Sequence, residues 1–117
     1  MRPKTILCDI DGTIFRHHGS GLTGQLVNVE MLQGAKEKFM EWDSKGYNII
    51  LLTGRRESMR VITERQLTES GLYYDQLIMG LGGGQRCLIN DLKTGESQPT
   101  AISINIKRNE GLKDVQL

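Results

Sequence analysis

Residues 5–14, TILCDIDGTI, run from an apolar segment into a pair of carboxylates, and this stretch decides the fold. Its apolar part, from Thr5 to Cys8, is typical of a buried strand, because short continuous apolar runs suit parallel strands. Asp9 and Asp11 follow at once. A carboxylate removed from water is costly without a cation or hydrogen-bond donors. The stretch therefore predicts a site at the carboxyl end of the strand, where something compensates two negative charges.

The composition favours a single soluble domain, 1–117. With 38% hydrophobic and 25% charged residues, the 117-residue chain is large enough for one core and too short for two. Its net charge of +1 does not indicate binding to nucleic acid or anionic lipid, although a local basic patch would leave a nucleic-acid substrate open. There is no signal-peptide pattern and no apolar run near the ~20 residues that span a bilayer. We expect a cytoplasmic protein that does not bind membranes.

Periodicity and turn residues predict the element order βαβαβββ. One helix ends at Gly46 and a second covers about 57–70. Besides the first strand, strands are expected at 47–53, 76–79, 86–90 and 101–106. Alternating strands and helices predict an α/β, Rossmann-like three-layer sandwich with a mostly parallel sheet. Residues 80–86 are too few for a helical crossover, so a tight loop or an antiparallel strand is expected there.

Three polar segments follow predicted strands: Asp9 with Asp11, then Thr53-Gly54-Arg55, then Asn90-Asp91. Ligands of open α/β sheets bind beyond the carboxyl ends of the strands, so these segments should meet. Carboxylates without His or Cys ligands suit Mg²⁺.

Two further features favour phosphate as the ligand. Gly12 permits a tight turn that brings backbone amides close to a ligand, and the Thr13 hydroxyl can hold that turn. Thr53 leads into the start of a helix, where free N–H groups attract anions. The sequence therefore predicts a phosphoryl site.

These segments resemble the first, second and fourth motifs of the haloacid dehalogenase (HAD) superfamily: 9–13 (DIDGT), 50–55 (ILLTGR) and 88–91 (LIND). The resemblance implies a Mg²⁺-dependent phosphatase in which Asp9 attacks phosphorus and Asp11 acts as acid and base. Asp9, the main-chain carbonyl of Asp11 and Asp91 would hold the metal, with Asn90 next to it.

The resemblance also implies the phosphate contacts and exposes a departure. Thr53 serves catalysis and phosphate binding, and the further phosphate-binding candidates are Ile10, Gly12, Gly54, Arg55 and Lys93. The family's third motif is a lysine that offsets the charge of the nucleophile, but this region reads GGGQR at 82–86. Arg86 is the first substitute and Lys93 the second, with Arg55 and Arg56 behind them.

The chain leaves no room for a cap domain, so the resemblance implies an open site. Capless relatives act on phosphates carried by large molecules or form oligomers. The expected function is hydrolysis of a phosphomonoester, either a sugar phosphate or a phosphate on a larger molecule. The alternative is a phosphate-binding module without turnover.

Other patterns have simpler interpretations. Cys8 and Cys87 are expected as buried, reduced thiols. The helical spacing of Phe39, Met40 and Trp42 favours core or interface positions. His17 and His18 favour a surface loop over a flap that faces substrate. The glycine-rich stretch 80–84 favours a close backbone approach to the site over a nucleotide cradle.

Overall fold

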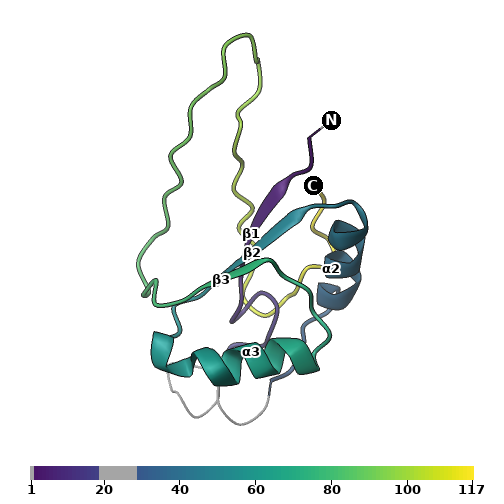
Figure 1. The fold of residues 1–117 in the computed structure, drawn as a ribbon, viewed down its shortest axis with the longest axis vertical. Helices are drawn as coiled ribbons and strands as arrows, with labels where there is room; N and C mark the ends of the chain where they lie inside the picture. The colour runs from purple at the N-terminus through teal and green to yellow at the C-terminus, as the bar shows by residue number, and fades with distance from the viewer. Residues whose placement is uncertain (1, 19–28) are drawn as a thin grey trace.

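The computed structural model describes residues 2–18 and 29–117 (Figure 1). Three parallel strands form the sheet: β1 (Thr5–Asp9), β2 (Asn48–Leu52) and β3 (Gln76–Ile78). Their order in space, β1-β2-β3, follows the chain. Helix α2 (Ala35–Ser44) connects the first two strands, and η1 (Glu57–Met59) with α3 (Arg60–Glu69) connects the last two. This part of the predicted α/β, Rossmann-like architecture is confirmed.

Burial alternates along the strands and shows which face of the sheet meets the core. Ile6 and Cys8 of β1, Ile49 and Leu51 of β2, and Leu77 of β3 are buried. Successive side chains of a strand point to opposite faces, so these five share one face. The same apolar cluster contains Phe39 and Trp42 of α2 and Leu67 of α3. Both helices therefore cover that face, as right-handed crossovers between neighbouring parallel strands require.

The opposite face of the sheet is more open. Leu7 of β1 is 43% exposed and Ile78 of β3 is 40% exposed. The described residues thus make two layers, and the third layer of the predicted sandwich is not found among them. Phe39 and Trp42 lie in the core, whereas Met40 of α2 is 60% exposed, so for Met40 the core position is wrong and the interface position stays a prediction. Met40 follows Phe39 by one residue and so points to a different side of the helix.

The strands predicted at 86–90 and 101–106 do not form. Residues 82–106 instead make two extended limbs that project from the body, which we call the arm (Figure 1). Every residue from 81 to 100 is exposed, Cys87 among them, so the prediction of a buried Cys87 is wrong, whereas Cys8 is buried and both cysteines are free. The 80–86 connection is too short for a parallel crossover, and the antiparallel pairing that it would allow does not form among the described residues.

The C-terminal residues return to the body and close the core. Leu112 is buried in the main cluster, and its amide donates to the Gln33 carbonyl at 2.9 Å. Gly111 lies so close to Gln33 that a Cβ there would collide with its backbone, and its φ of +86° also excludes most other residues. Within the described residues, no helix has the length and apolarity needed to cross a bilayer.

Candidate functional site

The loops that follow the strands emerge at one edge of the sheet. The parallel register pairs Asp9 with Leu52 and Leu52 with Ile78, so these three residues end their strands side by side, and the loops that start at Ile10, Thr53 and Met79 leave the sheet together. This is the edge at which ligands of open α/β sheets bind. The predicted first and second motifs therefore do meet.

The loop after β1 is a tight turn built around one carbonyl. The Ile10 carbonyl accepts hydrogen bonds from the amides of Thr13, Ile14 and Phe15 at 3.1, 2.8 and 3.1 Å. Gly12 adopts a φ of +90°, which a residue with a Cβ would tolerate poorly. The side chains of Ile10 and Ile14 are fully buried, so the turn is fixed to the core. A phosphate contact predicted at Ile10 would thus involve its backbone and not its side chain.

Asp11 forms a two-pronged ion pair with Arg55, which the sequence analysis did not foresee. The Arg55 Nε and Nη2 atoms donate to the two carboxylate oxygens of Asp11, both at 2.8 Å. Nη1 donates to Thr63 Oγ1 at 3.0 Å and to Gln66 Oε1 at 2.6 Å. The Arg55 side chain is 1% exposed and that of Asp11 13%. The Arg55 guanidinium therefore binds the Asp11 carboxylate and two side chains of α3. It is not exposed to solvent, where it could bind phosphate.

Asp9 has a different environment, with a carboxylate that is accessible. Its side chain is 38% exposed, and Arg86 Nη1 donates to Asp9 Oδ1 at 3.0 Å. The Thr13 hydroxyl reaches Oδ2 at 3.5 Å, the weak limit of a hydrogen bond. The structure thus brings Arg86, the first substitute for the missing lysine, to the predicted nucleophile.

Thr53 and Gly54 hold the second loop and position the glycine-rich segment. The buried Thr53 hydroxyl accepts a hydrogen bond from the Arg55 amide at 3.0 Å. A Cβ at Gly54 would lie 2.8 Å from the Gly82 carbonyl oxygen. The glycines at 80–84 therefore approach the second motif closely, as predicted.

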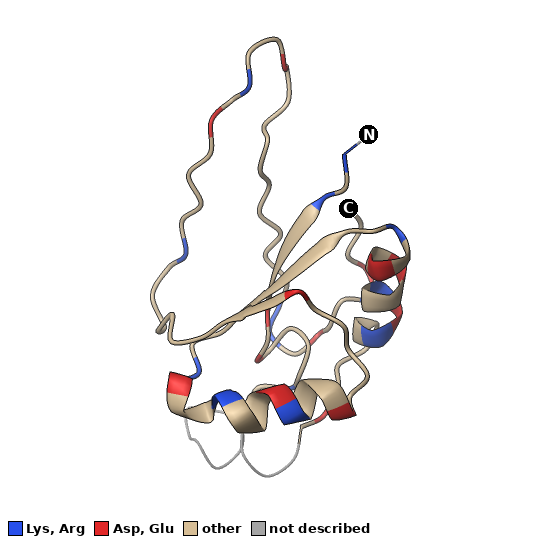
Figure 2. Cartoon of the chain, in the orientation of Figure 1, with Lys and Arg blue, Asp and Glu red and all other residues tan. Residues whose placement is uncertain are grey.

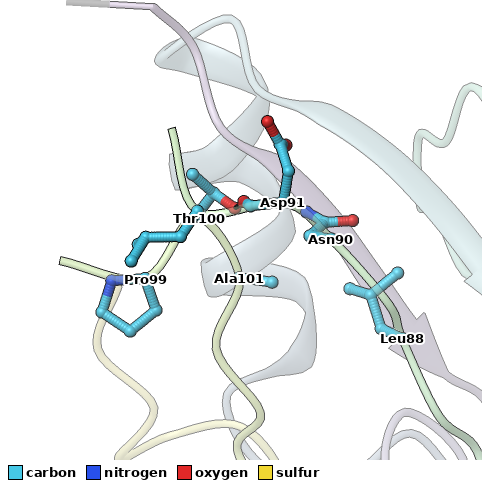
Figure 3. A pocket seen from close by; sticks show the side chains of 7 residues that line it. Leu88, Asn90, Asp91, Pro99, Thr100 and Ala101 are labelled. Carbon is cyan, nitrogen blue, oxygen red and sulfur yellow. Dashed lines mark hydrogen bonds between the residues drawn. The ribbon is translucent and has the colours of Figure 1, made fainter. Parts of the chain in front are cut away.

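The fourth motif is not part of this cluster. Asp91 lies on the arm at a shallow pocket between the two limbs, where the Thr100 hydroxyl donates to the Asp91 carbonyl at 2.6 Å (Figure 3). Asn90 lines the same pocket, and Lys93 is exposed in the turn at the tip of the arm. No set of three His, Cys, Asp or Glu side chains that could hold a metal occurs among the described residues.

Asp9 and Asp11 still offer a partial fit to Mg²⁺. This ion is commonly bound by one or two carboxylates and keeps water and phosphate oxygens as its other ligands. Asp9 supplies one accessible carboxylate. The main-chain carbonyl of Asp11, in the described part of the chain, accepts no hydrogen bond, so it is available as a second oxygen. These two oxygens fit a Mg²⁺ ion whose other ligands are water and oxygens of the substrate.

One residue of the site, Asn109, was missed because nothing near it in the sequence marks it. Asn109 lies on the C-terminal segment with a φ of +67° and binds the loop after β1. The backbone N–H of Asn109 donates to the Gly12 carbonyl at 2.9 Å, and its side-chain Oδ1 accepts from the backbone N–H of His17 at 2.7 Å. The exposed Arg108 next to it passes over Gly12, with its Cγ 3.2 Å from where a Cβ would stand. Arg108 is thus an exposed cation beside the loop after β1.

His17 and His18 differ in exposure. His17 is half-buried and fixed through its backbone by Asn109, while His18 is exposed. Most of the flap considered for this region, 19–28, lies outside the described residues.

Comparison with known proteins was informative only for solved structures. No family model matches the chain, and no curated protein does. A chain of the Pnkp1/Rnl/Hen1 complex is 29% identical with a TM-score of 0.60, covering 73% of this chain and 30% of that one. A chain of the Pnkp1/Rnl/Hen1 RNA repair complex is 30% identical with a TM-score of 0.58, covering 66% of this chain and 25% of that one.

A third neighbour shows the fold alone. It is a protein from Vibrio cholerae, 21% identical with a TM-score of 0.53, covering 75% of this chain and 79% of that one. All three likenesses agree with a small Rossmann-like α/β fold. The chain spans less than a third of the two neighbours from the repair complexes.

Proposed function

We propose that this protein is a Mg²⁺-dependent phosphatase of the HAD type that hydrolyses phosphomonoesters through an aspartyl-phosphate on Asp9. The observation that carries the proposal is the Asp9 environment. Its carboxylate is accessible at the carboxyl edge of the sheet and lies 3.0 Å from the Arg86 guanidinium. A nucleophile that attacks an anionic phosphate needs a neighbouring cation, since the two negative charges otherwise repel each other.

The chemistry divides between two carboxylates. An Asp9 oxygen attacks phosphorus, the bond to the ester oxygen breaks, and Asp11 gives that oxygen a proton. Water then attacks phosphorus and loses a proton to Asp11, and the bond between phosphorus and Asp9 breaks. Mg²⁺, held by Asp9 and the Asp11 carbonyl, would neutralise phosphoryl charge when bound. Thr53 and the Gly54 amide are the proposed donors to the phosphoryl oxygens.

The similar structures support phosphoester chemistry. Two of them come from complexes that contain Pnkp1, Rnl and Hen1, one described as an RNA repair complex. This likeness favours a nucleic-acid end among the candidate substrates, beside sugar phosphates and other phosphates on larger molecules. The net charge of +1 means that any such contact relies on local cations, of which Arg108 beside Gly12 is one candidate.

A second candidate function is phosphate binding without turnover. The Asp11–Arg55 pair favours it, because both carboxylate oxygens of Asp11 already accept an N–H group. These contacts hold the Asp11 carboxylate against Arg55, whereas proton exchange requires one of its oxygens to reach the ester oxygen of the substrate. The distance of Asp91 from this cluster points the same way, since one proposed metal ligand is not in place.

Hydrolysis of a generic aryl phosphate, followed by phosphate release, tests the proposal. With Mg²⁺, we expect turnover that falls by at least ~100-fold in Asp9→Asn and with a chelator. Asp43→Asn, a change of the same type at an exposed position of α2, should keep the activity. Equal rates for Asp9→Asn and the parent protein would exclude Asp9 as the nucleophile.

A metal fluoride that mimics a phosphoryl group separates the two functions. If the protein binds it in an Asp9-dependent manner but releases no phosphate from sugar phosphates, nucleotides, phosphorylated oligonucleotides or phosphoproteins, the binding module is the better description. Phosphate release from one of these four classes identifies the class of the substrate.

A further inference from the structure

The arm exposes an unusual amount of apolar surface for a molecule of this size. Its large apolar side chains are Leu88, Ile89 and Leu92 on the first limb, at 58, 92 and 64% exposure, and Ile102 and Ile104 on the second, at 69 and 47%. Single exposed apolar residues are ordinary, but five on one projecting segment mark a surface that another molecule covers.

The second limb has the sequence pattern of a strand. Residues 101–106, AISINI, alternate apolar and polar residues, so Ile102, Ile104 and Ile106 would share one face. The polar face already forms, since Asn105 Nδ2 donates to Ser103 Oγ at 3.2 Å. Ile106 packs against the core while Ile102 and Ile104 continue the same face into solvent. This limb has the sequence of a strand, and no strand in the described part of the chain pairs with it.

The backbone of the arm is unpaired as well. Within residues 86–106, all of them described, the one backbone hydrogen bond joins the Glu96 amide to the Lys93 carbonyl. Extended backbone with free N–H and C=O groups is a template for pairing with another strand.

Both ends of the arm are fastened to the body, so the arm is not a loose tail. Arg86 pairs with Asp9 at its start, and Ile106 packs on the core at its end. The arm lengthens the molecule to 49 Å along its long axis (Figure 1). The radius of gyration is 14.8 Å, against about 13 Å for a compact domain of this length.

The charges of the arm indicate which partner fits. Residues 86–106 carry two cations, Arg86 and Lys93, and two anions, Asp91 and Glu96, which alternate along the first limb and the tip, while the second limb, 97–106, carries no charge (Figure 2). A nucleic-acid surface would call for an excess of Lys and Arg. Two identical neutral surfaces, in contrast, meet without repulsion, and a two-fold interface satisfies both at once.

We propose that two copies of this chain associate through their arms, pairing the extended limbs and burying their isoleucines and leucines between them. The inference is independent of the proposed phosphatase activity.

The molar mass of the full chain in solution, measured from about 1 to 100 μM, tests it. We expect a dimer whose dissociation constant rises at least ~100-fold in the double variant Ile102→Ser, Ile104→Ser, because two buried isoleucines would be lost. The matched control is Val61→Ser, Tyr73→Ser, which changes two side chains of the body that are each 72% exposed. It should leave the dimer intact.

The thermal midpoint of the monomer distinguishes the proposal from an arm that folds onto its own body. Under the proposal, the isoleucine variant and the control unfold at similar temperatures when diluted to monomers. A monomeric mass throughout the range, or a dimer that the isoleucine variant does not weaken, would overturn the proposal.

Cys87 provides a second measurement on the arm itself. It is exposed, while Cys8 is buried, so a pyrene maleimide should label Cys87 alone. Excimer fluorescence that grows with concentration and disappears in the isoleucine variant supports association through the arms.

Discussion

At the scale of residues, Arg55 connects the site to the rest of the fold. It reaches from the loop after β2 to Asp11 in the loop after β1 and to Thr63 and Gln66 on α3. A buried cation is tolerated only when its donors are satisfied, and here four hydrogen bonds do so. The pairing could not be predicted from sequence, because Arg55 and Asp11 are 44 positions apart and Arg55 was assigned to phosphate.

Replacing Arg55 should therefore reduce stability before it affects any substrate. Arg55→Met leaves Asp11 without its partner, and loss of one partner from a buried ion pair costs roughly 3–5 kcal/mol. The free energy of unfolding in urea measures this. Arg56→Met is the control, since Arg56 is exposed next to it and should stay within about 0.5 kcal/mol of the parent. Equal losses in both variants would contradict the structural role of Arg55.

Asn109 offers a second test at this scale. Asn109→Ala removes the two side-chain hydrogen bonds to His17 and forces alanine into a left-handed conformation, so we expect a loss of about 2 kcal/mol in unfolding free energy. Asn109→Gly should recover part of it, because glycine accepts a positive φ. Asn105→Ala, on the exposed arm, serves as the matched control. If all three variants have the same free energy of unfolding, the contacts of Asn109 with the loop after β1 do not contribute to stability.

At the scale of elements, the sequence was most informative where the pattern is local. The strand that begins at Thr5, the helix that ends before Gly46 and the helix that ends before Gly71 lie where periodicity and glycine predicted them. The segments 86–90 and 101–106 were predicted as strands on the same grounds. Apolar residues cluster in 86–90 and alternate with polar ones in 101–106. A strand depends on a neighbour that the sequence cannot specify, so these two predictions failed.

Strand β1 contains a group whose titration affects stability. Burial raises the pKa of the Cys8 thiol from 9.0 to about 12, and the adjacent Asp9 charge contributes in the same direction. The folded state therefore disfavours the thiolate that the unfolded chain forms above pH 9. Stability from this group is complete below pH 9 and is lost as the pH rises towards 12.

We expect the parent protein to lose up to ~1.4 kcal/mol per pH unit through Cys8 between pH 9 and 11. Cys8→Ala should be less stable at pH 7 because of the cavity it leaves, and the gap to the parent should narrow with rising pH. Cys87→Ala should follow the parent, since its thiol is exposed. Urea unfolding at pH 7, 9, 10 and 11 provides the measurement, and a gap that stays constant would refute this account of Cys8.

At the scale of the whole molecule, a compact body carries an extended arm. The body could be predicted in outline, because the first three strands and both helices give one hydrophobic cluster. The arm could not, because its two limbs pair with no described strand and its start contacts Asp9 through Arg86, 77 positions away. Asp91 lies five residues further along the extended first limb and is not part of the site.

Limited proteolysis reports on this division. Trypsin at nanomolar protein concentration should cut first after Lys93, because residues 81–100 are exposed and irregular. The two fragments should stay together, held by the contacts of Asn109 with Gly12 and of Leu112 with Gln33. Mass spectrometry and size-exclusion chromatography follow both events. Lys93→Gln should slow the first cut, and an early cut within α2 or α3 would disagree with the described body.

The Asn109 contact has a further consequence for how this protein matures. The loop that carries Asp11 and Gly12 belongs to the first part of the chain to be synthesised, yet the side chain that fixes it at His17 lies 92 positions downstream. Such a distant contact closes late in folding. A nascent chain can therefore assemble β1, α2 and β2 while the loop after β1 still lacks this contact, and the proposed phosphatase site is complete only after translation has passed Asn109.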